Sequence, residues 1–189
     1  MIGFSGTGKS HSGRLAAREL SARFVDMDRA ISQAAGKPIV DIFAEDGEEA
    51  FREMERQQLA QAASAPGSQV ISTGGGVPCD ARNRDVMNAA GLTIRLTAAP
   101  ETLHQRLSRG GHPAGAQGGR SRTTIRPMLS EDVPLERIRE LLAEREGAYA
   151  AAADATIDTE GRKPADVAAE IVGLARGATR SRQPRMEGF

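Results

Sequence analysis

An α/β fold, in which helices cover both faces of a parallel sheet, is predicted by two patterns in this 189-residue sequence. Helical and strand-like segments alternate along nearly the whole chain, as is typical of parallel sheets. A glycine-rich segment, Gly3-Phe4-Ser5-Gly6-Thr7-Gly8-Lys9-Ser10, opens the first predicted helix. Loops at the carboxyl ends of parallel strands are where such folds bind ligands. We therefore expect three layers, with a ligand site near the start of the chain.

Each predicted element is bounded by recognisable signals. Glycine or proline marks the ends of most segments in which apolar residues recur every three or four positions. Helices are predicted over residues 9–21, 28–35, 39–44, 48–63, 80–90, 100–109, 135–152 and 164–176. Short runs rich in β-branched or aromatic residues predict strands over residues 23–26, 69–73, 92–96 and 155–158.

Two segments depart from this alternation. Residues 109–126 are rich in glycine and arginine and carry few apolar side chains, which predicts a surface loop. Residues 177–189 are polar and basic, and we expect them to form a flexible tail. The remainder, residues 1–176, is short enough for a single domain.

Composition narrows the classes of partner. The formal net charge is zero, so the overall balance does not indicate binding to nucleic acid or to an acidic membrane surface. Cys79 is the only cysteine, which excludes a disulfide within the chain and fits a reducing cytosol. No apolar run approaches the roughly 18 residues of a membrane span. We expect a cytoplasmic protein.

The segment Gly3–Ser10 matches the phosphate-binding pattern G-x-x-x-x-G-K-[ST] at every fixed position. Its glycines allow backbone N–H groups to turn inward around a polyphosphate. Lys9 is expected to reach the β- and γ-phosphates, and the Ser10 hydroxyl to bind Mg²⁺. An ordinary glycine turn is the alternative, but the helix predicted directly afterwards favours nucleotide binding.

Only Met1 and Ile2 precede this glycine-rich segment. A phosphate-binding loop normally follows a buried strand of five or six residues. We therefore expect that the natural start lies a few codons upstream and adds a run rich in valine, isoleucine or leucine.

Asp26 and Asp28 flank Met27 where the second strand is predicted to end. Residues i and i+2 of an extended segment share a face, so both carboxylates could point into one crevice. There they could bind a metal ion or accept a hydrogen bond from a substrate hydroxyl. The alternative for one of them is a structural role as the N-cap of the following helix.

Two arginines are candidates for binding an anion. Arg52 and Glu55 are i,i+3 neighbours on a predicted helix, where an exposed pair contributes only about 0.2–0.5 kcal/mol. Yet an arginine held by a carboxylate is also well suited to grip a ligand carboxylate. Arg145 lies in line with apolar residues of the 135–152 helix. It could pair with a structural acid or face a ligand anion.

Together these motifs resemble the shikimate kinase family, over about residues 1–176. The loop is shared with a very large superfamily, but the patterns F-x-D-x-D, A-E-x-G-E-x-x-F-R and G-G-G separate this family from gluconate and nucleoside-monophosphate kinases. In family order the sequence carries Gly3–Ser10, Phe24-Val25-Asp26-Met27-Asp28, residues 42–52, Thr73-Gly74-Gly75-Gly76, Ile125-Arg126-Pro127 and Glu144-Arg145.

The resemblance implies a P-loop kinase fold: a three-layer α/β/α arrangement around a five-stranded parallel sheet. It also implies a mobile lid at about residues 109–126 and a substrate-binding helical region at about residues 28–63, in a monomer. The implied reaction is transfer of the γ-phosphoryl group of ATP to the 3-hydroxyl of shikimate, with Mg²⁺, on the route to chorismate and the aromatic amino acids.

The resemblance further implies roles for single residues. Asp28 would bind the ring hydroxyls and act as the base, while Arg52, oriented by Glu55, and Arg145 would bind the substrate carboxylate. Gly75 would offer backbone N–H groups to the substrate, and aromatic walls are expected from Phe43 and Phe51. Expected nucleotide contacts are Gly6, Thr7, Gly8, Lys9, Ser10, His11, Arg126 and Arg162, with Lys9 and Arg126 also catalytic; expected magnesium contacts are Ser10 and, through water, Asp26.

The sequence departs from the family at a few positions. His11 stands where a threonine is usual, so we expect weaker ATP binding. Residues 146–149 replace a run usually written R-x-P-L-Y, which bears on where Arg145 points. Met128 replaces a leucine, and the insert at 109–126 is long and rich in glycine. Two other functions stay open: a gluconate-type sugar-acid kinase, and a catalytically weakened nucleotide-binding regulator.

Replacing Asp28 tests its role as the base. Asp28→Asn keeps the size of the side chain but removes the proton acceptor, so turnover should fall by about 10²-fold or more. Steady-state turnover with saturating substrates measures this change. Near-normal turnover in the variant would leave Asp28 a binding role alone.

Overall fold

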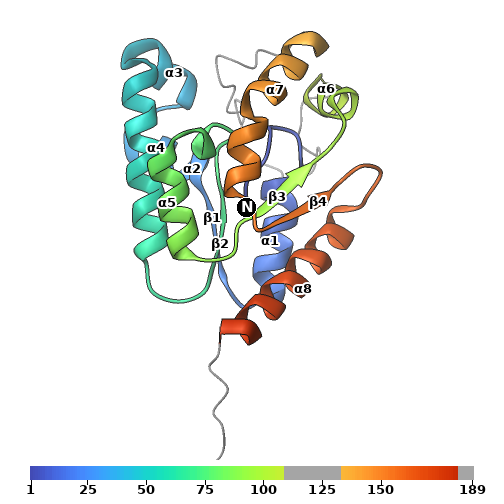
Figure 1. Cartoon of the computed structure of the whole chain (residues 1–189). Coiled ribbons are helices and arrows are strands. Elements are labelled where there is room, and N and C mark those ends of the chain that lie inside the picture. Colours follow the sequence, from blue (N-terminus) through green and yellow to red (C-terminus); the bar gives the residue numbers. More distant parts are fainter. Residues whose placement is uncertain (109–132, 183–189) are drawn as a thin grey trace, which may run out of the picture.

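The computed structural model describes residues 1–108 and 133–182, which form a layered α/β unit (Figure 1). Its strands are β1 (Arg23–Asp26), β2 (Gln69–Ser72), β3 (Ile94–Thr97) and β4 (Ala155–Asp158). Its helices are α1 (Lys9–Glu19), α2 (Met27–Ala35), α3 (Ile39–Glu45), α4 (Gly47–Ser64), α5 (Ala81–Ala90), α6 (Pro100–Ser108), α7 (Leu135–Ala152) and α8 (Pro164–Arg182), with a short 3₁₀ helix at Val77–Cys79.

The strands form two parallel pairs. β1 pairs with β2, and β3 pairs with β4. Met1 and Ile2 join the two pairs: Ile2 bridges to Arg95 in β3, and the Met1 carbonyl accepts a hydrogen bond of 3.1 Å from the Thr73 amide just after β2. The described residues therefore do not form a five-stranded sheet. The central fifth strand is reduced to one bridge, because Gly3 already turns away with a φ of 136°.

Helices cover both faces of the strands, as the alternation of elements predicts. On one face, α1 and α8 lie side by side and pack on β3 and β4 through a cluster that includes Ala16, Leu96 and Ile171 (Figure 1). On the other face, Ile2 packs with apolar residues of α2, α4, α5 and α7, Tyr149 among them. Burial nevertheless alternates along β2 and β3, where Val70, Ser72, Ile94 and Leu96 are buried and the residues between them are half-buried.

The predicted helices and strands all occur, with most ends within two residues of the prediction. The exception is α8, which continues to Arg182 although a tail was expected from residue 177. No proline interrupts this extension before residue 184, and the strong helix formers Ala178, Arg180 and Arg182 alternate with weaker ones in it. The sequence also did not indicate the 3₁₀ helix at Val77–Cys79.

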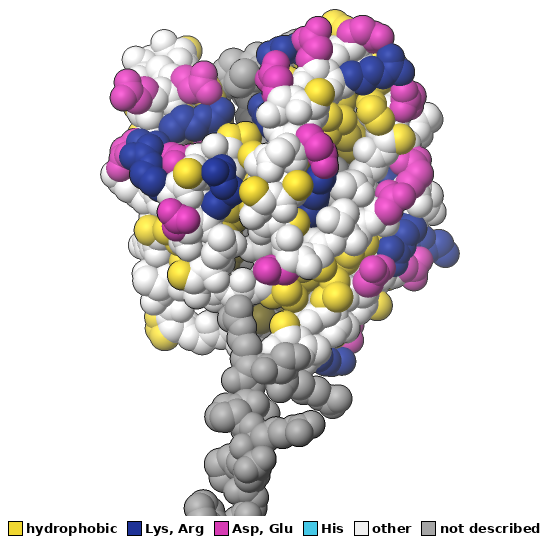
Figure 2. Space-filling view, viewed as in Figure 1, with side chains coloured by type: hydrophobic (Ala, Val, Ile, Leu, Met, Phe, Trp, Pro, Cys, Tyr) yellow, Lys and Arg dark blue, Asp and Glu magenta, His cyan; other side chains and the backbone are white. Residues whose placement is uncertain are grey.

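Charged residues of both signs are interspersed on the visible face of the molecule, in keeping with a net charge of zero (Figure 2). Most of them lie toward the end where α3 and α6 are found. Among the described helices, none is long and apolar enough to cross a membrane.

Two glycines make a matched test of the fold. A methyl group added at Gly3 would overlap the Leu96 backbone, and its φ of 136° disfavours other residues, so Gly3→Ala should lose at least about 1–3 kcal/mol of stability. Gly173 lies exposed in α8 with nothing near its Cα, so Gly173→Ala should gain about 0.5–1 kcal/mol. Urea unfolding measures both changes. Equal effects of the two variants would contradict the close approach at Gly3.

Candidate active site

The glycine-rich loop folds as a phosphate cradle at the amino end of α1. Gly6 and Gly8 have φ values of 85° and 87°, a region in which a side chain would be strained. Gly8 is the N-cap, and no side chain caps the first N–H groups of α1. Those N–H groups, with the positive end of the helix dipole, make the end of α1 suitable for an anion.

Lys9 is folded against the loop. Its Nζ donates hydrogen bonds of 2.9 Å to the carbonyls of Gly3 and Phe4, and only 9% of the residue is exposed. The Thr7 hydroxyl donates to the Phe4 carbonyl at 2.8 Å. Thr7 therefore shapes the loop from within, and its buried side chain is not presented to a ligand. His11 lies exposed in the first turn of α1, where its backbone belongs to the cradle.

Ser10 and Asp26 meet at the end of the cradle. The Ser10 hydroxyl donates to Asp26 Oδ2 at 2.6 Å, and Ser72 Oγ lies 3.5 Å from Ser10 Oγ. Asp26 is also the N-cap of α2, accepting from the Arg29 amide at 3.3 Å. The N-cap role considered for one of the two aspartates thus falls on Asp26.

Asp26 and Asp28 do not share the face of a strand, as their spacing had suggested. The strand ends at Asp26, and α2 begins at Met27, so Asp28 belongs to the first helical turn. The i,i+2 argument holds only for extended backbone. Asp28 is half-buried at the same end of β1.

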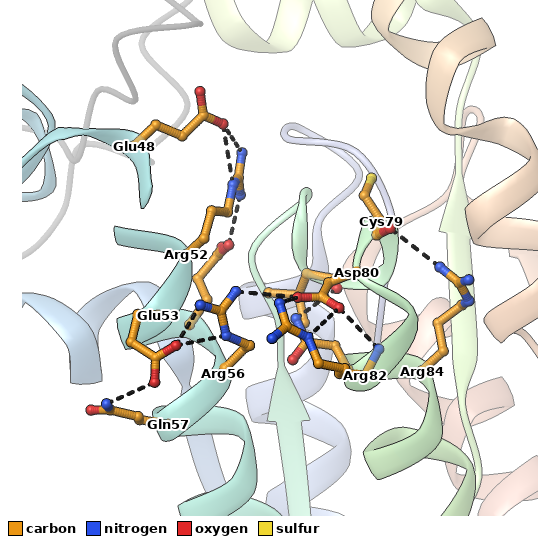
Figure 3. A network of polar contacts seen from close by, with 12 residues as sticks. Glu48, Arg52, Glu53, Arg56, Gln57, Cys79, Asp80, Arg82 and Arg84 are labelled. Carbon is orange, nitrogen blue, oxygen red and sulfur yellow. Dashed lines mark hydrogen bonds and ion pairs between the residues drawn. The ribbon is translucent and has the colours of Figure 1, made fainter. Parts of the chain in front are cut away.

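A cavity of about 310 Å³ opens beside the loop, and the two candidate arginines both line it. Arg52 donates from one nitrogen to Glu55 at 2.6 Å and from two others to Glu48 at 2.9 and 3.2 Å (Figure 3). Glu55 is fully buried, so this pair is not the exposed helix-surface pair that sequence spacing would allow. A buried carboxylate fixes the direction of the guanidinium.

Arg145 is the second of the two candidate arginines that line the cavity. Its guanidinium lies 5.6 Å from the centre of the Phe4 ring, so it connects the cavity to the glycine-rich loop. Within residues 1–108 and 133–182 it forms no ion pair. Its half-buried guanidinium lines the cavity.

The glycines after β2 form the wall between these arginines. A methyl group added at Gly76 would overlap the Arg52 guanidinium, so only glycine allows this close approach. Gly75 is buried, and its carbonyl accepts a hydrogen bond of 2.8 Å from the Tyr149 hydroxyl. Gly76 lines the cavity.

Several lining residues were not found from the sequence. Arg56 bridges Glu53 and Asp80, and Asp80 also pairs with Arg82 while capping α5 (Figure 3). These residues come from α4 and from the start of α5 with its N-cap, so only the tertiary structure brings them together. The cavity is also lined by Glu48, Cys79 and Asn83. Burial raises the pKa of the Cys79 thiol, which keeps it protonated.

Other expected site residues lie apart from this cavity. Phe51 is fully buried with Ile31, Ile39 and Ile42, and its ring centre lies 4.5 Å from that of Phe43. Neither phenylalanine lines the cavity, but the guanidinium of Arg52, which does, lies 5.6 Å from the centre of the Phe51 ring. The predicted lid at 109–126, with Arg126, lies outside the described residues, as does Met128.

The β4–α8 turn approaches the glycine-rich loop from the other side. Arg106, which the sequence did not single out, donates to the Gly6 carbonyl at 3.1 Å and to the Thr159 carbonyl at 2.9 Å. Arg162, expected at the nucleotide, pairs with Glu170 at 2.7 Å and donates to the Asp158 carbonyl. Arg106 therefore ties the loop to the turn that carries Arg162.

A cradle of this form holds the phosphates of a nucleotide, and the arginine-lined cavity beside it suits an anionic acceptor. The fold and site thus define a kinase of the P-loop class. A family model described as shikimate kinase matches residues 5–175. The chain belongs to the shikimate kinase family.

Relatives and solved structures agree with this assignment. Shikimate kinase from Symbiobacterium thermophilum is 43% identical over 172 residues, covering 91% of this chain and 92% of the relative. Shikimate kinase from Geobacter metallireducens is 39% identical, covering 94% and 90% of the two chains. The solved structure of shikimate kinase from Acinetobacter baumannii in complex with shikimate superposes with a TM-score of 0.80 at 31% identity, covering 93% and 90%.

The Asp80 cluster should make stability depend on pH. Hydrogen bonds from Arg82 and Arg56 lower the pKa of Asp80 from 3.8 to about 2. Its charged form is thus favoured in the folded state, so its contribution is present above about pH 4 and lost as the pH falls toward 2. Asp80→Asn keeps a capping oxygen but not the charge, so its melting temperature should be lower than wild type at pH 7 and converge on it near pH 2.

Asp80→Ala is the control for this prediction, because it removes the cap as well as the charge. Loss of the cap costs about 1 kcal/mol, so this variant should stay below Asp80→Asn at both pH values. Thermal unfolding at pH 7 and near pH 2 provides the comparison. A wild-type advantage over Asp80→Asn that is independent of pH would contradict the role of the charge.

Proposed function

We propose that this protein transfers the γ-phosphoryl group of ATP to the 3-hydroxyl of shikimate. The observation that carries the proposal is the position of Arg145, which lines the cavity and also contacts Phe4 of the phosphate cradle. An anionic acceptor held by Arg145 would therefore lie next to the nucleotide phosphates. Phosphoryl transfer depends mainly on such positioning and on charge neutralisation.

The acceptor's carboxylate is assigned to the two arginines. Arg52 presents a guanidinium whose orientation is set by Glu55 and Glu48, and Arg145 brings a second positive charge. Planar guanidinium groups bind carboxylates through paired hydrogen bonds, which fix orientation as well as position. Gly75 and Gly76 would offer backbone N–H groups to the ring hydroxyls. Membership of the shikimate kinase family makes shikimate the expected acceptor.

The nucleotide phosphates are assigned to the cradle. Backbone N–H groups of Gly6, Thr7, Gly8 and the first turn of α1 would surround them, and Lys9 would exchange its two carbonyl partners for phosphate oxygens. His11 would contribute through its backbone rather than its exposed side chain. Arg126 would reach the phosphates from the lid, and Arg162 would border the adenine.

A magnesium ion fits the oxygens of Ser10 and Asp26. The two lie 2.6 Å apart, and hydroxyl and carboxylate oxygens are ligands that Mg²⁺ accepts. No cluster of three metal-binding side chains occurs in the part of the chain that the structure describes. That is consistent with Mg²⁺ in kinases, which takes most ligands from phosphate and water. When bound, it would neutralise charge on the β- and γ-phosphates.

Asp28 is the proposed base for the acceptor hydroxyl. It lies in the first turn of α2, at the end of β1 where Asp26 meets Ser10. A carboxylate there could accept the proton or orient the hydroxyl. The product would feed the chorismate pathway to the aromatic amino acids, and we propose a monomeric, cytoplasmic enzyme.

ADP release measured with and without shikimate tests the proposed function. Shikimate-dependent ADP formation is expected, with formation of shikimate 3-phosphate confirmed by mass spectrometry. Activity with gluconate in place of shikimate would instead support a sugar-acid kinase. Nucleotide binding without turnover on either compound would support a weakened regulator.

Replacing the guanidinium of Arg52 by an amine tests whether this side chain binds the carboxylate of shikimate. Arg52→Lys keeps the charge but loses the paired hydrogen bonds, so shikimate binding should weaken by about 1–3 kcal/mol while ATP affinity stays constant. Calorimetric titration measures both affinities. Arg137→Lys, an exposed change on α7, is the control and should alter neither. Equal losses for both ligands in Arg52→Lys would indicate a purely structural arginine.

A further inference from the structure

Tyr149 connects α7 to the glycine turn of the proposed substrate site. Its hydroxyl donates to the Gly75 carbonyl at 2.8 Å, and the side chain is 1% exposed. A tyrosine in such surroundings needs a partner for its hydroxyl, because a buried polar group without one is costly. Here the partner is a backbone carbonyl in the turn that lines the cavity.

This hydrogen bond fixes the peptide between Gly75 and Gly76. The described peptides are all trans, so the Gly76 N–H points away from the Gly75 carbonyl, and hence away from Tyr149. Gly76 lines the cavity, with the Arg52 guanidinium against its Cα. No acceptor bonds to the Gly76 N–H within residues 1–108 and 133–182. The Tyr149 hydroxyl thus orients a donor that a ligand in the cavity could use.

Tyr149 is itself held by a charged pair. The Arg95 guanidinium lies 5.1 Å from the centre of the Tyr149 ring and donates to Glu146 at 2.7 and 2.5 Å. Arg95 extends from β3 and its side chain is 12% exposed, so its direction is well defined. Glu146 and Tyr149 are i,i+3 neighbours on α7 and face β3 together. Arg145 and Tyr149 are i,i+4 neighbours, so the same contacts set the rotation of α7 that brings Arg145 to the cavity.

We propose that Tyr149 is a positioning residue that sets the Gly75–Gly76 peptide in the substrate site, and that Arg95 and Glu146 hold it there. The proposal rests on the proposed function only for the identity of the ligand, shikimate.

The sequence offers a spectroscopic probe of this arrangement. Tyr149 is the only tyrosine, and the chain has no tryptophan, so near-ultraviolet emission at tyrosine wavelengths reports on this ring alone. Emission should change when shikimate is added to the wild-type protein, because the ligand contacts the peptide to which the hydroxyl is bonded. ATP alone should produce a smaller change.

Tyr149→Phe is the decisive variant, since it removes only the hydroxyl from a buried ring. The KM for shikimate should rise about 3- to 10-fold, the range expected for one hydrogen bond, with kcat within about twofold and the KM for ATP unchanged. Unchanged KM values, or equal rises for shikimate and ATP, would overturn the positioning role. A wild-type enzyme that releases no ADP with shikimate would instead count against the proposed function.

Glu146→Gln tests whether the ion pair of Arg95 with Glu146 holds Tyr149 in place, with Glu140→Gln as the matched control. Both residues are exposed glutamates of α7 paired with an arginine, but only Glu146 pairs with the arginine that stacks on Tyr149. Glu146→Gln should change the emission of the unliganded protein and raise the KM for shikimate about 2- to 4-fold. Glu140→Gln should do neither. If the two variants showed the same emission, the Arg95–Glu146 pair would not hold Tyr149, whether or not the enzyme turns over.

Discussion

The site depends on the backbone pairing of Met1 and Ile2 between the two strand pairs. Ile2 exchanges hydrogen bonds of 2.9 Å with Ile94 and Leu96, while Met1 bonds to Ile71 and Thr73 on the other side. The phosphate cradle leaves the sheet directly after this contact. It therefore lies between the ends of β1 and β2 and the turn after β4, which carries Arg162. Only glycine fits at position 3, where the chain turns against Leu96.

The acceptor side of the site is organised by a buried charge. Glu55 is fully buried on α4 and is compensated by Arg52, which also bonds to Glu48. Removing one partner of such a pair typically costs about 3–5 kcal/mol, because the other charge is left without compensation. A buried ion pair contributes little net stability to a helix, but it fixes the direction of the Arg52 guanidinium. Gly76 accepts the resulting close approach because it has no side chain.

Two of the departures from the family pattern, at His11 and at residues 146–149, leave this arrangement in place. Arg145 faces the cavity although the residues after it differ from those usual in the family, because Glu146 and Tyr149 are both held by Arg95. His11 projects to solvent from the first turn of α1, where its backbone N–H remains part of the cradle.

The sequence by itself determined the order of helices and strands and the glycine-rich loop, and it singled out the two arginines that line the cavity, because periodicity, glycine spacing and motif order are local properties. It placed Asp26 and Asp28 on one face of an extended segment, whereas α2 begins at Met27, since one residue decides whether a strand continues or a helix begins. It also allowed an exposed Arg52–Glu55 pair, because spacing along a helix does not state which face is buried. The contacts of Arg106 with Gly6, of Arg56 with Asp80 and of Tyr149 with Gly75 join distant segments. Only the tertiary structure decided them, because packing of the helices on the sheet sets which side chains meet.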